Sequence, residues 1–277
     1  MVDMELTRIY ELIVILYAAS VLLYFIDFVQ NNRKANSIAF WLLSIVWVLQ
    51  TAFLILRMFE TGRFPILTVS EGLYFYAWVL ITLSLVINRL FRVDFMVFFT
   101  NVIGFLIMAI HTFAPLETYT AVQSERLVSE LLIIHITMAI LSYGAFSVSF
   151  VFSALYLVQY NLLKKKKWGK RLLRIEDLTK LDYMSYVLIL IGVPLLLLSL
   201  ILGIIWAYIK YVDFHWYDTK VLGSFLMFVA YSAYLYARLR RGIQGKAIAM
   251  WNIGLFLVLL INFFLFGSLS NFHFWGS

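Results

Sequence analysis

Long apolar stretches alternate with short polar segments along the whole chain. A helix of roughly twenty mostly apolar residues is long enough to cross the hydrocarbon core of a bilayer. Windows of this kind predict eight membrane-spanning helices, over residues 9–28, 38–58, 71–88, 95–113, 131–159, 183–208, 220–239 and 247–267. The pattern therefore predicts an all-α fold, a polytopic transmembrane bundle of about eight helices.

Composition supports a membrane protein and excludes several other classes. Hydrophobic residues make up 64% of the 277 residues, charged residues make up 13%, and the mean hydropathy is +0.92, unlike an ordinary soluble domain. No polar stretch is long enough for a separate soluble domain, so residues 1–277 are expected to form a single integral membrane domain of a multi-pass protein of the cell (plasma) membrane. The absence of cysteine excludes disulfides, Cys-type zinc sites and thiol catalysis.

Basic residues mark one side of the predicted membrane. The segments after predicted helices 1, 3, 5 and 7 hold most of the 22 Lys and Arg residues, including Arg33, Lys34, Arg89, Arg92, Lys164 to Lys167, Lys170, Arg171, Arg174, Lys180, Arg238, Arg240, Arg241 and Lys246. The positive-inside bias places these segments in the cytoplasm, so both termini are expected outside. The net charge of +7 then reflects topology, and no nucleic-acid partner is expected.

The stretch from Gly203 to Lys220 leaves one predicted span and enters the next, on the outer side. It is dense in Trp, Tyr and Phe and also contains Asp213, His215, Asp218 and Lys220. Ring faces with a polar edge can hold a large flat ligand. Aromatic belts at membrane interfaces are also ordinary anchors that need no ligand. The composition of this strip leaves both interpretations open.

All four histidines fall at the outer surface under the same orientation. His111 lies near the end of predicted helix 4, His135 one turn into helix 5, His215 in the strip and His273 in the carboxy-terminal tail. Polar groups at membrane depth are costly and are seldom kept without a partner or a task. A histidine near an interface can coordinate iron, or it can simply hydrogen-bond to a neighbouring carbonyl.

Three stretches in order carry a family resemblance. Phe64 to Trp78 brings Glu71 into predicted helix 3, and Glu130 to Tyr143 opens predicted helix 5 with His135. The third is the strip itself, followed by Tyr234 to Arg238 and a tail that ends Ser270 to Trp275. In this order and spacing the chain resembles the cytochrome c assembly family of haem-handling membrane proteins, which includes CcsA and CcmC, from predicted helix 3 onward.

The resemblance implies a haem site on the outer face. In that family two outward-facing histidines flank a tryptophan-rich strip and act as axial ligands of the haem iron, and the matching positions are His135 and His273. The other residues expected at the cofactor are Trp206, His215, Trp216, Tyr217, Asp218, Lys220 and Glu71. Glu71 and Asp218 could each hydrogen-bond a ligand histidine or hold an outer loop. The outer cations available for the haem propionates are Lys210, Lys220, Arg126 and Arg63.

Departures from the family pattern point to one branch. The family strip ends in Trp-Asp-Pro-Lys-Glu, whereas this chain keeps Trp206, Ala207, Asp218 and Lys220 but has Tyr211, His215, Tyr217, Thr219 and Val221 at other matching places, with Trp216 one place out of register. A transmembrane histidine of haem-exporting members falls at Tyr236. The pattern is similar to the HemX branch, which implies a non-enzymatic membrane protein that lowers the level of glutamyl-tRNA reductase in tetrapyrrole synthesis.

Two other functions remain open. The chain could be a haem-delivery subunit of a c-type cytochrome synthase, which acts with a second cytochrome c assembly membrane protein. A small-molecule transporter is a third possibility, but the lack of charged residues at mid-membrane depth argues against an ion-coupled one.

The segment Asn161 to Asp182 is the longest predicted cytoplasmic loop. After its basic run, Leu172, Ile175, Leu178 and Leu181 recur near helical spacing, which predicts a short amphipathic helix. This segment could bind glutamyl-tRNA reductase or another cytoplasmic partner. Its composition favours the other interpretation, in which it lies on the anionic lipid of the bilayer, as basic amphipathic segments beside spans commonly do.

Overall fold

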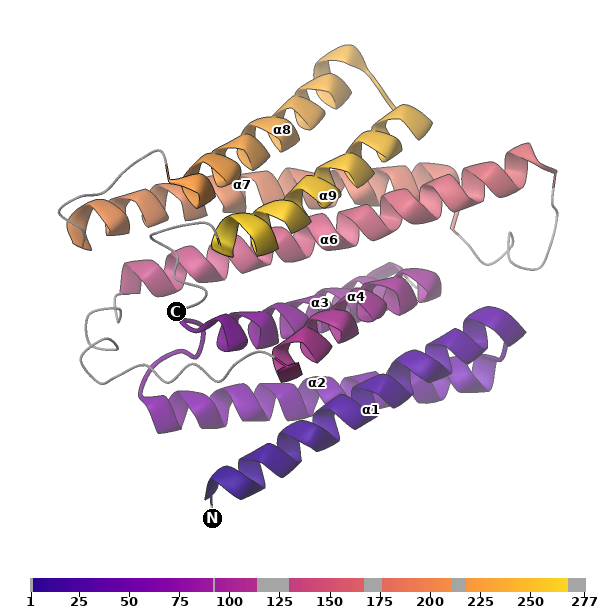
Figure 1. The fold of residues 1–277 in the computed structure, drawn as a ribbon. Coiled ribbons are helices and arrows are strands. Elements are labelled where there is room, and N and C mark those ends of the chain that lie inside the picture. Colours follow the sequence, from indigo (N-terminus) through magenta and orange to yellow (C-terminus); the bar gives the residue numbers. More distant parts are fainter. Residues whose placement is uncertain (1, 92, 114–129, 167–175, 211–217, 269–277) are drawn as a thin grey trace. The chain divides into compact units, whose positions relative to one another are not determined.

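The computed structural model describes residues 2–91, 93–113, 130–166, 176–210 and 218–268. Every regular element in this part of the chain is an α-helix (Figure 1), so the predicted all-α fold is confirmed. The helices are α1 (Val2–Gln30), α2 (Arg33–Thr61), α3 (Val69–Phe91), α4 (Asp94–Phe113), α6 (Glu130–Lys164), α7 (Leu178–Lys210), α8 (Thr219–Arg241) and α9 (Lys246–Ser268). All eight are long and apolar enough to cross a membrane.

The helices form two compact units, unit 1 (Met1–Thr120) and unit 2 (Ala121–Ser277). In unit 1, α1 packs on α2 and α4, and α3 packs on α4 and α2. In unit 2, α6 packs on α7 and α9, and α8 packs on α7 and α9. One integral membrane domain over residues 1–277 stays a prediction.

Interhelical hydrogen bonds hold unit 1 together at membrane depth. The indole of Trp47 donates to Thr82 (2.8 Å), and the indole of Trp78 donates to Thr51 (2.9 Å), so α2 and α3 are joined twice. Asn101 on α4 accepts from Tyr17 of α1 at 3.0 Å. Because the bilayer core offers no water, these polar side chains must find partners within the protein.

Small residues let the two longest helices of unit 2 approach closely. The hydroxyl of Ser142 on α6 donates to the carbonyl of Gly192 on α7 at 2.9 Å, and a Cβ built on Gly192 would lie 2.6 Å from Cε1 of Phe146. Farther along, Ser149 on α6 donates to the carbonyl of Ser185 at 2.8 Å. The small residues of α6 therefore serve packing, as small residues do between transmembrane helices.

A buried polar cluster ties α9 to this pair. The amide nitrogen of Asn252 lies 2.8 Å from the hydroxyl of Ser149, 2.9 Å from that of Ser153 and 3.2 Å from that of Ser185. The ring of Phe146 on α6 stacks on the ring of Tyr231 on α8, with centroids 3.8 Å apart. Polar and aromatic contacts thus fix the order of the helices in unit 2.

The helices run past the apolar windows at most of their ends. Asn32 begins α2 by accepting from the backbone N–H groups of Lys34 and Ala35, and Gly62 ends it with φ of 64°. An Asn at the N-cap and a Gly in the left-handed conformation at the C-terminal end are common helix start and stop signals. Gly242 ends α8 in the same left-handed conformation.

The predicted loop Asn161 to Asp182 is shorter than expected. Residues 161–164 belong to α6 and residues 178–182 belong to α7. Asp182 accepts two hydrogen bonds from the guanidinium of Arg238, at 3.0 and 2.6 Å, and this ion pair joins the start of α7 to the end of α8. Leu178 and Leu181 are therefore part of a spanning helix and not of a separate amphipathic one, while Leu172 and Ile175 lie outside the described residues.

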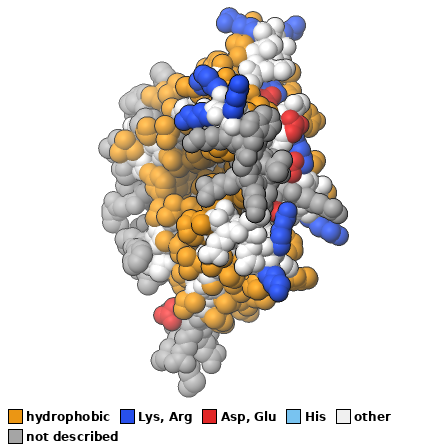
Figure 2. Space-filling view, turned by 90° about the vertical axis from the view of Figure 1, so that its right-hand side faces the viewer, with side chains coloured by type: hydrophobic (Ala, Val, Ile, Leu, Met, Phe, Trp, Pro, Cys, Tyr) orange, Lys and Arg blue, Asp and Glu red, His pale blue; other side chains and the backbone are white. Residues whose placement is uncertain are grey.

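Basic side chains gather at one end of unit 2. Exposed Lys164 ends α6 and exposed Lys165 and Lys166 follow it. Arg240, Arg241 and Lys246 flank the turn between α8 and α9. Figure 2 looks onto the right-hand side of Figure 1 and shows Lys and Arg side chains there beside hydrophobic ones. The outside location of both termini stays a prediction.

Candidate functional site

The side chain of His135 on α6 hydrogen-bonds to α7, at the end of unit 2 opposite to the exposed basic residues Lys164 to Lys166. Its Nδ1 lies 2.6 Å from the backbone carbonyl oxygen of Ser199. The hydroxyl of Ser199 lies 3.1 Å from the same nitrogen and donates to the backbone carbonyl of His135 at 3.0 Å. Each residue thus contacts the other through both backbone and side chain, which fixes the orientation of the imidazole.

The ring rests on a glycine. A Cβ built on Gly203 would lie 2.5 Å from Cε1 and 2.7 Å from Nδ1 of His135, closer than real Cβ contacts allow. In an α-helix the carbonyl of residue i points toward residue i+4. A ring that bonds to the Ser199 carbonyl must therefore lie over residue 203, and glycine leaves room for it.

The Ser199 contact determines which nitrogen of His135 can act as a ligand. A backbone carbonyl is only an acceptor, so Nδ1 must carry the hydrogen. In the neutral ring Nε2 then keeps its lone pair, which is the arrangement of metal-ligating histidines whose other nitrogen donates to a carbonyl. His135 therefore fits the role of an axial ligand to iron.

Charged residues enter this end of unit 2 from α8. Asp218 caps the helix by accepting from the backbone N–H of Lys220 at 2.9 Å. The ammonium of Lys220 donates to the carbonyl of Asn262 on α9 at 2.7 Å, and the side-chain amide of Asn262 donates to the hydroxyl of Tyr143 on α6 at 2.9 Å. The predicted residues Asp218 and Lys220 thus lie at the same end of unit 2 as His135.

Trp206 is buried on α7, one turn beyond Gly203, with 5% of its surface exposed. Unit 2 therefore brings four of the predicted cofactor residues to one end: His135, Trp206, Asp218 and Lys220. Four others, His215, Trp216, Tyr217 and His273, lie outside the described residues.

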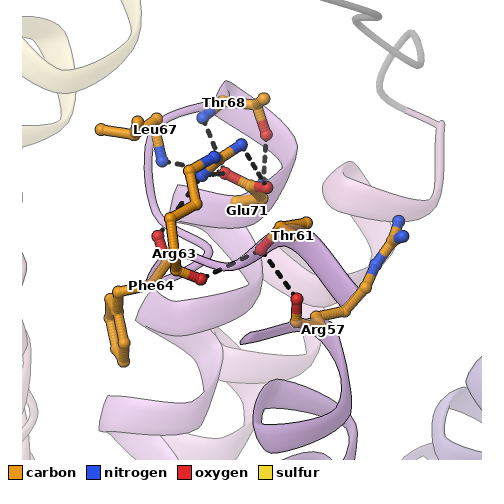
Figure 3. Close-up of polar contacts among 7 residues, drawn as sticks. All are labelled: Arg57, Thr61, Arg63, Phe64, Leu67, Thr68 and Glu71. Carbon is orange, nitrogen blue, oxygen red and sulfur yellow. Dashed lines mark hydrogen bonds and ion pairs between the residues drawn. The ribbon is translucent and has the colours of Figure 1, made fainter. Parts of the chain in front are cut away.

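Glu71 belongs to unit 1, where its carboxylate holds the segment between α2 and α3 (Figure 3). It accepts from both terminal nitrogens of the Arg63 guanidinium, at 3.0 and 3.1 Å, and from the backbone N–H groups of Leu67 and Thr68, at 2.9 and 3.1 Å. The hydroxyl of Thr68 accepts from the N–H of Glu71 at 3.0 Å, which completes a capping box at the start of α3. Of the two expected roles, Glu71 thus holds a loop, and its contact with a cofactor stays a prediction.

His111 is anchored within unit 1 by different neighbours. Its Nδ1 lies 2.8 Å from the hydroxyl of Ser70, and its ring meets those of Tyr10 and Tyr74 edge-on, with centroids 5.0 and 5.5 Å apart. A hydroxyl can donate or accept, so this contact does not select a tautomer. His111 differs in this respect from His135.

Three residues of the site were missed from the sequence: Ser199, Gly203 and Asn262. Ser199 and Gly203 are spaced four apart on one face of an otherwise Leu- and Ile-rich helix, and this spacing was an available signal. Asn262 contributes a backbone carbonyl, for which a sequence carries no signal.

Comparison with known proteins identifies the family. The sequence profile described as "Cytochrome C assembly protein" matches residues 66–273, which make up most of the chain. The chain belongs to the cytochrome c assembly protein family. The match to this family includes both His135 and His273.

Comparison with individual proteins shows which members of this family the chain is similar to. "Protein HemX" of Bacillus subtilis (strain 168) is 66% identical over 273 residues, which cover 99% of each chain. "Protein HemX" of Brevibacillus brevis is 47% identical over 271 residues, which cover 98% of this chain and 99% of that protein. "Cytochrome c biogenesis protein CcsA" of Prochlorococcus marinus is 28% identical over 256 residues, 83% of this chain and 81% of that protein. The chain is thus a multi-pass membrane protein of this family that is similar to HemX proteins over its whole length.

The glycine under His135 gives a direct test of the site's packing. We expect Gly203→Ala to destabilise the protein by about 1–3 kcal/mol, because the new methyl group must displace a ring that Ser199 holds in place. Gly254→Ala on α9 is the matched control, since nothing lies within 4 Å of a Cβ built there. Thermal unfolding in detergent measures the difference. Equal midpoints for the two variants would contradict the packing described for His135.

Proposed function

We propose that the protein binds haem on its outer face, with His135 and His273 as axial ligands, and acts as a non-enzymatic HemX-type regulator. In this role it lowers the level of glutamyl-tRNA reductase in tetrapyrrole synthesis. The observation that carries the haem part is the Nδ1 contact of His135 with the Ser199 carbonyl, which leaves Nε2 as the ligand atom. Full-length similarity to two HemX proteins supports the regulatory part.

The residues of unit 2 supply different parts of this site. Haem supplies an iron that takes two axial ligands and a flat apolar ring with two carboxylates. His135 is held in place by Ser199 and Gly203, and Trp206 lies one turn farther along α7. The strip residues His215, Trp216 and Tyr217 are proposed to cover the ring, as aromatic side chains do for large apolar ligands.

Two long helices could carry a conformational change from the outer site to the cytoplasmic side of the plasma membrane. His135 lies near the start of the 35-residue helix α6, and exposed Lys164 ends the same helix. On the 33-residue helix α7, Asp182 lies near the start and Ser199 lies in the second half. We therefore place the docking of glutamyl-tRNA reductase at residues 161–182, at the end of both helices. Anionic lipid is the competing occupant of these basic residues.

Similarity to CcsA proteins favours one alternative. The chain would then be a haem-delivery subunit of a c-type cytochrome synthase and would work with a second cytochrome c assembly membrane protein. The haem site at His135 is common to both proposals. What separates them is the process that fails when the protein is absent.

Haem binding is tested by absorption spectroscopy of the purified protein supplied with haem. We expect a low-spin spectrum from the wild type and its loss in both His135→Ala and His273→Ala, because each variant removes one axial nitrogen. His111→Ala is the control and should keep the spectrum. A wild-type protein that binds no haem in excess ligand would contradict the proposal, as would a spectrum unchanged in His135→Ala.

Gene deletion tests the regulatory role. Without the protein we expect a higher level of glutamyl-tRNA reductase on immunoblots and an intact set of c-type cytochromes on haem-stained gels. Re-expression of the wild type should reverse the increase. The opposite result, loss of c-type cytochromes at an unchanged reductase level, would favour the synthase subunit.

A further inference from the structure

Lys220 places a positive charge at the haem-proposed end of unit 2, and no carboxylate of the described residues lies within ion-pair distance of its ammonium. Its ammonium donates to the Asn262 carbonyl at 2.7 Å and lies 5.7 Å from the ring centroid of Phe263. A carbonyl and an aromatic ring are only partial negative charges. An ammonium group has three N–H donors, so these two neighbours leave it able to bind an anion.

Two other shielded cations among the described residues are paired with carboxylates. Arg63 has 14% of its side chain exposed and pairs with Glu71, and Arg238 has 9% exposed and pairs with Asp182. No carboxylate of the described residues forms an ion pair with the ammonium of Lys220. Asp218, two residues away, instead directs an oxygen to the backbone N–H of Lys220 at 2.9 Å.

The surroundings raise the cost of leaving this charge without a counterion. Lys220 is part-buried in the first turn of a membrane-spanning helix, where a charged group is expensive without a partner. The start of a helix also carries a partial positive charge, which favours a nearby anion and not a second cation. An anionic ligand at this point would relieve both.

The position of Lys220 indicates which anion it meets. Asn262, which accepts from its ammonium, also donates from its side-chain amide to the hydroxyl of Tyr143 at 2.9 Å, and Tyr143 lies on α6, the helix that carries His135. A porphyrin bound at His135 carries two propionate carboxylates at its edge. Of the other outer cations, Arg63 already holds Glu71 on both terminal nitrogens, Lys210 is exposed at the end of α7, and Arg126 lies outside the described residues.

We infer that Lys220 binds a propionate carboxylate of the haem whose iron His135 would hold. This inference rests on the proposed function and adds to it the group that recognises the acidic edge of the porphyrin. The ammonium keeps its contact with the Asn262 carbonyl and uses a remaining N–H for the carboxylate. Lys220 thereby discriminates between porphyrins with free and with masked carboxylates.

The test is a spectral titration of the purified full-length protein with two ligands, haem and haem dimethyl ester, in which the propionates are masked. We expect the wild type to bind haem about tenfold or more tightly than the ester, the size of one hydrogen bond between charged groups. Lys220→Met should lose this preference by weakening haem binding and leaving ester binding unchanged. Lys220→Arg should retain most of it.

Lys246→Met is the matched control, because Lys246 also lies in the first turn of a helix but at the other end of unit 2. It should bind both ligands as the wild type does. Equal affinity of the wild type for the two ligands would overturn the inference and leave the proposed haem site standing. If Lys220→Met weakened the binding of both ligands equally, the inference would also be overturned, since Lys220 would then only connect α8 to α9. If the wild type binds neither ligand, the inference fails together with the proposed function.

Discussion

The contact between Nδ1 of His135 and the Ser199 carbonyl is the interaction on which this end of unit 2 depends. It fixes the direction of the imidazole, selects the nitrogen that keeps a lone pair, and requires glycine at position 203. A histidine that only pointed toward the membrane surface would be free to adopt either tautomer. The backbone of α7 removes that freedom before any ligand arrives, which is how a rigid element preorganises a site.

That contact exists only because α6 and α7 lie close together. Serine and glycine let the two helices approach along their length, with the Ser142 hydroxyl on the Gly192 carbonyl and the Ser149 hydroxyl on the Ser185 carbonyl. The Lys220 ammonium adds a further link, from α8 to α9. The packing of unit 2 and the position of the His135 ring therefore have the same origin, which is a close fit between helices in a bilayer core without water.

Hydropathy and residue type predicted much of this from the sequence, but only at the level of spans and candidate side chains. The eight helices followed from the apolar windows, and the location of His135, Asp218 and Lys220 at the same end of unit 2 followed from the order of these helices. The helix ends did not, because a window stops at the first polar residues while the backbone continues until a cap such as Gly62 or Gly242 ends it. The partner of His135 is a backbone carbonyl, which every residue has, so no side-chain pattern could name it. The partner of Glu71, by contrast, was visible in the sequence, because Thr68 and Glu71 have the spacing of a capping box.

The most direct test of this account is the protonation state of the two ring nitrogens of His135, measured by nitrogen-15 NMR on protein labelled at histidine, without haem. The signals of His135 are assigned by their loss in His135→Ala. We expect a neutral ring with the hydrogen on Nδ1 and an unprotonated Nε2, because the Ser199 carbonyl can only accept. A ring with its hydrogen on Nε2 would contradict the account, since the nitrogen proposed to meet the iron would then have no lone pair to offer.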